Sequence, residues 1–195
     1  MDQLFADALA GSVDAFGRII ERHRSYLKLL TRVKLRMGTA HTDASDIVQE
    51  AFVNAVRGFE TFRGASESEF TAWLHTILAR CIVDYLRKKS VGVDQRKTVE
   101  LVAAELDQTS ARWIVNLVSP YQDPGVEAER RESLLLLAES LDKLPNDYRE
   151  AIVLRQLEEL SFSDVAAQMD RTVDSVRKLW ARGMVELRVI MKDLN

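Results

Sequence analysis

The chain has 195 residues, carries a formal net charge of −3 and contains a single cysteine, Cys81. This length fits one or two small domains, one cysteine excludes an internal disulfide, and no apolar run reaches the roughly 18 residues of a membrane span. The N-terminus lacks the basic-then-apolar order of a signal peptide, so a cytoplasmic protein with no membrane segment is expected. Few Gly and Pro residues among many Leu, Ala, Arg and Glu predict an all-α fold.

Three amphipathic helices are predicted in the first half of the chain, because apolar residues recur there at steps of three and four. They cover residues 12–36, a segment that begins at Asp43 or Ser45 as its N-cap, and residues 70–89. The segment 62–69 is expected to be a loop. Three helices joined by short loops can bury one core, so residues 12–90 are predicted to form a domain.

The periodicity weakens over residues 91–131, which also hold two of the three prolines. This composition predicts a linker with one short helix near residues 99–117. A second helical domain is predicted over residues 132–195, in which Pro145 ends one helix and opens the next. The chain is therefore expected to contain two small helical domains joined by a linker.

The segment LSFSDVAAQMDRTVDSVRKLWAR, residues 160–182, has the apolar spacing of two short helices joined by a tight turn. Ser161 is the expected cap of the first helix, and either Thr172 or Asp174 is that of the second. Such turns usually carry glycine, but this one holds Asp170, which tolerates the left-handed backbone conformation better than most residues. The basic second helix favours a DNA-binding helix-turn-helix over a plain core hairpin.

Basic residues gather in three segments although the net charge is negative: 18–36, 80–97 and 174–192. Local basic surfaces, rather than the net charge, determine where a polyanion can bind. Each segment alone is as compatible with a solvated helix face as with a nucleic-acid surface. The sequence has no metal-spaced His/Cys cluster, glycine-rich phosphate loop or nucleophile–base motif, so neither an enzyme nor a cofactor or metal site is predicted.

Three segments follow one another along the chain: DASDIVQEAFVNAVRGFETFRG, FTAWLHTILARCIVDYLRKK and residues 141–187. In this order and spacing they resemble region 2.2, regions 2.3 and 2.4, and region 4 of the sigma-70 family of bacterial RNA polymerase sigma factors, specifically its extracytoplasmic-function (ECF) group. The resemblance implies two helical domains with no extra domain between them. It also implies a non-catalytic subunit that directs RNA polymerase to promoters and helps to open the DNA.

The same resemblance implies three sets of binding residues. Core polymerase, through its β′ clamp helices, would bind the polar face of the D-x-x-Q-E-x-F pattern, formed by Asp46, Gln49 and Glu50. The separated strands of the promoter −10 element would bind Arg63, Arg80, Arg87, Lys88 and Lys89. The −35 duplex would bind Arg171, Ser175, Arg177, Lys178 and Arg182. The expected partners are core RNA polymerase with its β and β′ subunits, promoter DNA, and an anti-sigma factor of the kind that often inhibits family members.

Three more residues of the third predicted helix have separate interpretations. Trp73 lies on the apolar stripe and is expected in the core rather than stacked on a base. His75 is expected on the surface, and Asp84 is expected to be structural or to orient a neighbouring arginine. The alternative function is that of a helix-turn-helix regulator that binds duplex DNA without core polymerase, which would leave the DIVQEAF segment unexplained.

The chain departs from the family at the turn of the helix-turn-helix, where relatives commonly carry Gly-Ile or Gly-Val at the positions of Asp170 and Arg171. Val173 is expected to supply the packing that the missing apolar residue would provide. Arg171 is then free of the core, and we expect it to reach a phosphate beside the DNA groove.

Overall fold

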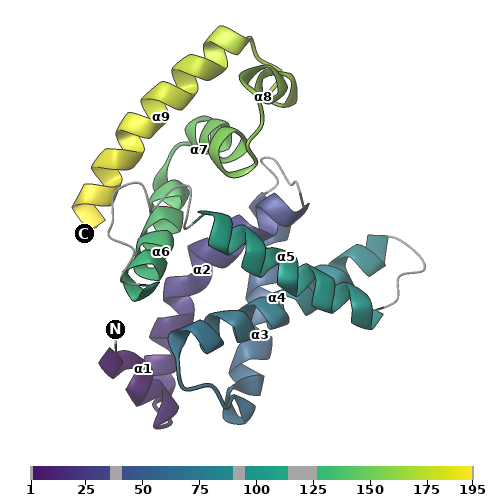
Figure 1. Cartoon of the computed structure of the whole chain (residues 1–195), viewed down its shortest axis with the longest axis vertical. Helices are drawn as coiled ribbons and strands as arrows, with labels where there is room; N and C mark the ends of the chain where they lie inside the picture. Colours follow the sequence, from purple (N-terminus) through teal and green to yellow (C-terminus); the bar gives the residue numbers. More distant parts are fainter. Residues whose placement is uncertain (1, 36–40, 90–94, 114–126, 195) are drawn as a thin grey trace. The chain divides into compact units, whose positions relative to one another are not determined.

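The computed structural model describes residues 2–35, 41–89, 95–113 and 127–194 of the chain. Every regular element in these ranges is a helix (Figure 1), which confirms the predicted all-α fold. The chain forms two compact units, one of residues 1–34 and 40–112 and the other of residues 35–39 and 113–195. Each unit is described by itself below.

The first unit contains the helices α1 (Asp2–Leu9), α2 (Val13–Leu35), α3 (His41–Gly58), η1 (Phe59–Thr61), α4 (Glu67–Lys89) and α5 (Gln95–Trp113). The three helices predicted from periodicity correspond to α2, α3 and α4. The predicted start of the second helix is wrong, because α3 begins at His41 and Asp43 and Ser45 both lie inside it. Helix α1 has no counterpart among the predictions, although its Phe5 and Ala8 are buried. Helix α5 lies four residues earlier than the helix expected near residues 99–117, and nearly all of it belongs to this unit.

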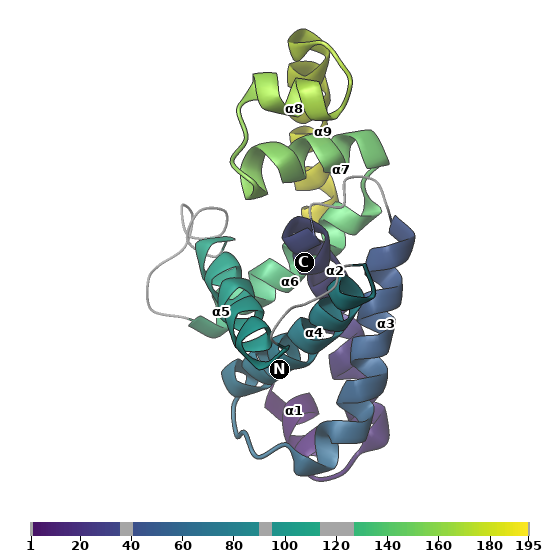
Figure 2. The same ribbon diagram turned by 90° about the vertical axis from the view of Figure 1, so that its right-hand side faces the viewer.

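The core of the first unit is formed by the apolar stripes of α2, α3 and α4. Helix α4 packs across α3 (Figures 1 and 2), and Leu27, Val48 and Leu78 are fully buried between the helices. An aromatic cluster extends this core toward the end of α3. Within it the ring of Trp73 lies 5.2 Å from that of Phe62 between centroids, as its place on the apolar stripe predicts.

Helix α4 begins three residues earlier than the sequence periodicity indicates, so the expected loop at residues 62–69 is wrong at its end. Ser66 and Glu69 form a reciprocal capping box: the Ser66 hydroxyl accepts from the Glu69 amide at 3.2 Å, and the Glu69 carboxylate accepts from the Ser66 amide at 3.1 Å. Hydrogen bonds from the amide of Ala65 and from Ser66 lower the pKa of Glu69. The S-x-x-E spacing of Ser66 and Glu69 is the sequence pattern that indicates this helix start.

A buried polar network, here called the clasp, joins α2, α4 and α5. The Nε2 of His75 lies 2.8 Å from the Tyr26 hydroxyl, which donates to Ser110 Oγ at 2.7 Å, and His75 Nδ1 lies 2.5 Å from Asp107 Oδ1. The prediction of a surface position for His75 is wrong, because only 2% of its surface is exposed. Helix α5 covers the face of α4 that the sequence alone left open, and an ion pair between Lys34 and Glu105 adds a second attachment.

The clasp predicts that Tyr26→Phe lowers the free energy of unfolding by about 1–3 kcal/mol, because it leaves the buried polar atoms of His75 and Ser110 with one partner fewer. Chemical denaturation measures the loss, and amide exchange should quicken more over α5 than over α3. The matched control is Tyr148→Phe, since the Tyr148 hydroxyl has no hydrogen-bond partner among the described residues. Equal exchange over α5 in the Tyr26 variant and the wild type would contradict this role of the clasp.

The second unit contains α6 (Glu127–Lys143), α7 (Asn146–Ile152), the π-helical turn η4 (Val153–Leu157), α8 (Phe162–Gln168) and α9 (Val173–Leu194). Pro145 lies between α6 and α7, where the sequence predicts a helix boundary. The Arg149 side chain of α7 donates to the carbonyls of Leu141, Asp142 and Leu144 at 2.6–2.8 Å. These bonds satisfy backbone acceptors that the end of α6 leaves open.

Helices α7 and α9 approach each other closely at Gly183. A Cβ atom at this position would lie 3.0 Å from the Cβ of Tyr148 and 3.1 Å from the Cδ1 of Ile152. Val176, Gly183 and Leu187 are the buried residues of α9, spaced so that they share one side of the helix. The opposite side of α9 is therefore left to solvent.

Candidate nucleic-acid and partner interfaces

The two helices of the predicted helix-turn-helix begin at side-chain caps. The Ser161 hydroxyl accepts from the Asp164 amide at 3.2 Å at the start of α8, and the Thr172 hydroxyl accepts from the Ser175 amide at 3.2 Å at the start of α9. The predicted cap Ser161 is thus confirmed, and of the two candidates for the second helix it is Thr172 that caps. The amide of Ser175 is occupied by this bond.

The turn between α8 and α9 closes through the backbone. Asp170 has a φ of 50°, in the left-handed region, as its place in the turn predicts. The next amide, that of Arg171, donates to the carbonyl of Ala166 at 3.0 Å, which is the six-to-one bond that commonly closes a helix with a left-handed residue. Val173 packs against the small core of Leu154, Val165, Ala166 and Val176, as expected.

This turn predicts that Asp170→Gly stabilises the second unit by about 0.5–1 kcal/mol, because glycine adopts a positive φ without the steric cost of a Cβ atom. Thermal denaturation measures the change. The control is Ala167→Gly, at an exposed position inside α8. There glycine should lower the stability of the unit by about the same amount, because it is a poor helix former. A loss of stability in Asp170→Gly would show that the aspartate side chain does more than tolerate the turn.

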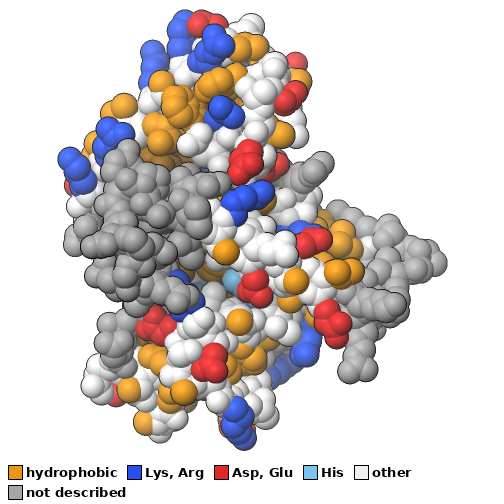
Figure 3. Space-filling model, viewed as in Figure 1, with side chains coloured by type: hydrophobic (Ala, Val, Ile, Leu, Met, Phe, Trp, Pro, Cys, Tyr) orange, Lys and Arg blue, Asp and Glu red, His pale blue; other side chains and the backbone are white. Residues whose placement is uncertain are grey.

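The solvent side of the first half of α9 is basic. Arg177, Lys178 and Arg182 are exposed on it, and Lys and Arg side chains gather where α8 and the start of α9 lie (Figure 3). Lys178 forms an ion pair with Asp174 one turn earlier at 2.7 Å, and this contact lowers the pKa of Asp174. Arg182 has no hydrogen bond or ion pair within the described residues.

Arg171 points toward α7 rather than away from the unit. Its Nη2 donates to Asp147 Oδ2 at 2.6 Å, although both side chains remain partly exposed. Burial and the neighbouring Asp147 raise the pKa of Glu150, while the positive charge of Arg171 acts in the opposite direction. The sequence predicted that Arg171 is free of the core but not that a carboxylate holds it.

An acidic and polar face lies on α3. Asp46, Gln49 and Glu50 are all exposed, and their spacing of three and four residues puts them on one side of the helix. Gln49 accepts from Arg24 Nη1 at 3.3 Å. Val53, one further turn along this side, is 40% exposed and adds an apolar contact point that the sequence interpretation had not included.

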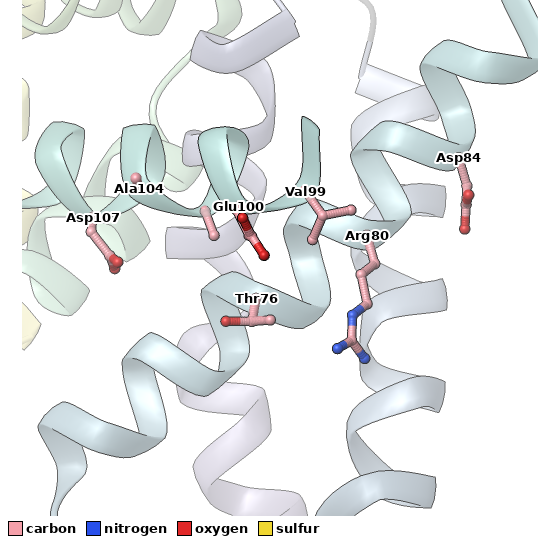
Figure 4. A pocket seen from close by; sticks show the side chains of 8 residues that line it. Thr76, Arg80, Asp84, Val99, Glu100, Ala104 and Asp107 are labelled. Carbon is pink, nitrogen blue, oxygen red and sulfur yellow. The ribbon is translucent and has the colours of Figure 1, made fainter. Parts of the chain in front are cut away.

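The basic residues of α4 lie in two places. Arg80 lines a groove of about 760 Å³ between α4 and α5, together with Thr76, Asp84, Val99, Glu100 and Asp107 (Figure 4). Arg87 and Lys88 are exposed near the end of the helix, and the Nη1 of Arg87 lies 3.8 Å from Asp84 Oδ1. The side chain of Lys89 lies outside the described residues.

Arg63 lies apart from these residues, after η1. Its Nη1 donates to the carbonyls of Glu60 at 2.8 Å and Phe62 at 3.1 Å, so the guanidinium group is held against the backbone of its own turn. The predicted DNA-binding residues of the first unit therefore lie at three positions: at Arg63, at Arg80, and at Arg87 with Lys88. Those of the second unit share one basic face.

Comparison with known proteins supplies the family. A model described as Sigma-70 region 2 matches residues 23–91, and one described as Sigma-70, region 4 matches residues 134–187. The ECF RNA polymerase sigma-E factor of Haemophilus influenzae is 32% identical over 182 residues, which span 92% of this chain and 89% of the relative. The chain belongs to the ECF sigma factors of the sigma-70 family. As a sigma factor, it directs core RNA polymerase to promoter −35 and −10 elements and promotes DNA opening.

A second relative agrees with this family. The sigma-E factor of Escherichia coli K12 is 30% identical over 182 residues, covering 90% of this sigma factor and 86% of the relative. A solved structure of the sigma factor RpoE with the anti-sigma factor NepR from Bartonella quintana is 20% identical, with a TM-score of 0.34 and coverage of 92% and 98%. The two family matches and the sigma-E relatives favour the sigma-factor interpretation over the alternative of a regulator that acts without core polymerase.

The matched regions contain the surfaces built above. The region 2 match includes α3 and α4, and the region 4 match includes the helix-turn-helix, whereas α5 lies outside both. None of the described helices combines the length and apolarity that crossing a membrane requires. Sigma factors are regulatory subunits, and no group of three or more potential metal-ligating side chains occurs in the described ranges.

Proposed function

We propose that this sigma factor reads the −35 duplex with the exposed side of α9. The observation that carries this assignment is the set of exposed cations Arg177, Lys178 and Arg182 on the first half of the second helix of a helix-turn-helix. Residues near the start of such a helix reach base edges in the major groove, and arginine pairs with guanine through two hydrogen bonds. Ser175 lies on the first turn of α9, where its hydroxyl can bond a phosphate.

The −10 element is proposed to bind along α4 as separated strands. Single strands need a positive track and places for unstacked bases, and exposed Arg80, Arg87 and Lys88 supply the charge, with Lys89 next in the sequence. Arg63 is held by its turn just before α4, and we propose that the loop of residues 62–66 around it captures an unstacked base. The groove beside Arg80 offers room for a base next to a cation.

Core polymerase is proposed to bind the polar face of α3. Asp46 and Glu50 present carboxylates to a basic partner helix, Gln49 adds an amide, and exposed Val53 supplies an apolar contact in the same row. This face belongs to α3 and the proposed DNA-binding cations to α4, so in this proposal one unit binds the β′ clamp helices and DNA through different helices. We place the protein in the cytoplasm, where RNA polymerase acts, without an enzymatic activity of its own. Inhibition by an anti-sigma factor stays a prediction, which co-purification from cells tests.

The polymerase assignment predicts that Glu50→Lys weakens binding to core polymerase about tenfold or more, because it puts like charges opposite each other at the interface. Binding is measured with purified core enzyme, and run-off transcription on genomic fragments should fall in parallel. Glu60→Lys, which reverses another exposed acid of the same unit, is the matched control and should retain both. If wild-type protein neither binds core polymerase nor supports initiation, the proposed function is wrong.

The ion pair with Asp147 predicts how Arg171 acts on DNA. In the wild type, Arg171→Ala should leave the salt dependence of −35 binding unchanged, because the carboxylate already neutralises the guanidinium. Asp147→Asn should free Arg171 for a phosphate, tighten binding to all sequences alike, and steepen the slope of log K against log salt by about 0.9. Adding Arg171→Ala to the Asp147→Asn variant should return both the affinity and the salt slope to their wild-type values. A flatter slope in Arg171→Ala alone would mean that Arg171 leaves Asp147 when DNA binds.

A further inference from the structure

The first residue of α8, Phe162, contacts the helix proposed to read the −35 element. Its ring is partly buried against the small core of the helix-turn-helix. Two guanidinium groups lie near this ring, that of Arg155 at 5.0 Å and that of Arg177 at 5.6 Å from its centroid. The indole of Trp180 meets it edge to face, with centroids 5.7 Å apart and planes at 80°. One aromatic side chain thus touches η4 and two successive turns of α9.

The two arginines differ in what else holds them. Arg155 also donates from Nη1 to the carbonyl of Leu160 at 2.9 Å, so its position is fixed by the backbone. Arg177 is exposed, and within the described residues it has no hydrogen bond or ion pair. Besides the charge of Asp174 three residues earlier, the Phe162 ring is the group found to interact with its guanidinium.

The attraction of a cation to an aromatic ring bears directly on recognition. A guanidinium within about 6 Å of a ring centroid is attracted by the negative face of the ring, and the contact restricts a side chain that otherwise loses much rotamer freedom on binding. A side chain held in advance near its bound position loses less entropy when it contacts a base. The edge-to-face contact with Trp180 fixes the ring itself, so the ring is a rigid support.

We infer that Phe162 is a positioning residue for Arg177, directing its guanidinium toward a base edge of the −35 element. This inference rests on the proposed function of α9 and assigns a role in specificity to a residue of the preceding helix. Three other residues that pack against the same core, Leu160, Met169 and Val173, have no aromatic ring. Filling the core alone therefore does not require an aromatic residue at position 162.

The test uses holoenzyme assembled from core polymerase and the full chain, with promoter fragments randomised across the −35 element. Sequencing the bound fraction gives the preference for each base at each position. Arg177→Ala identifies the position that Arg177 reads. At that position Phe162→Leu should reduce discrimination about two- to fivefold, which is the range expected for a partly exposed cation–ring contact, while Phe162→Tyr should retain it.

Two further variants separate positioning from stability. Met169→Ala loosens the same core without touching an arginine, so it should lower the melting temperature and leave the base preferences unchanged. In the Arg177→Ala background, Phe162→Leu should change discrimination no further. The inference is overturned if Phe162→Leu keeps full discrimination at the Arg177 position, or if Met169→Ala reduces it equally. A wild-type holoenzyme with no −35 preference would instead refute the proposed function of α9.

Discussion

The proposed −35 surface depends on how α9 is held, because a helix can present one side to DNA only if its other side is fixed. Two contacts fix it. The left-handed backbone at Asp170, closed by the bond from the Arg171 amide to Ala166, sets the direction in which α9 leaves α8. At Gly183 the absence of a side chain lets α9 lie directly on α7. The exposed cations of α9 take their positions from these two constraints.

Charge in this sigma factor acts locally and is partly neutralised from within. The net charge is −3, yet Arg177 and Arg182 form no ion pair among the described residues. A base that binds either arginine therefore does not have to displace an ion-paired carboxylate. Lys178, Arg171 and Arg87 are each within 4 Å of an aspartate. Such exposed pairs contribute little to stability. Their effect falls on DNA binding, since a phosphate must compete with the carboxylate that is already present.

The sequence could predict those elements that depend on residues close together in the chain. Hydrophobic periodicity located α2, α3 and α4, Pro145 marked a helix boundary, and Ser161 was recognised as a cap because a cap bonds to an amide three residues away. Contacts over long separations left no such signal. The burial of His75 depends on Tyr26 and Asp107, 49 and 32 residues away, and the pairing of Arg171 depends on Asp147, 24 residues earlier. The residue types for the candidate site were therefore predictable, but not which of them have partners.

Helix α5 shows the same limit at the level of a whole element. The weak periodicity of residues 91–131, which include two prolines, predicted a linker. Helix α5 also lies outside both family matches. Yet the clasp fixes it by bonds that only a folded α2 and α4 can supply, and Glu100 and Asp107 line the groove that Arg80 also lines. These carboxylates lower the positive potential beside Arg80. Under the proposed −10 binding, a segment outside both family matches therefore brings negative charge beside one of the cations that would hold the DNA.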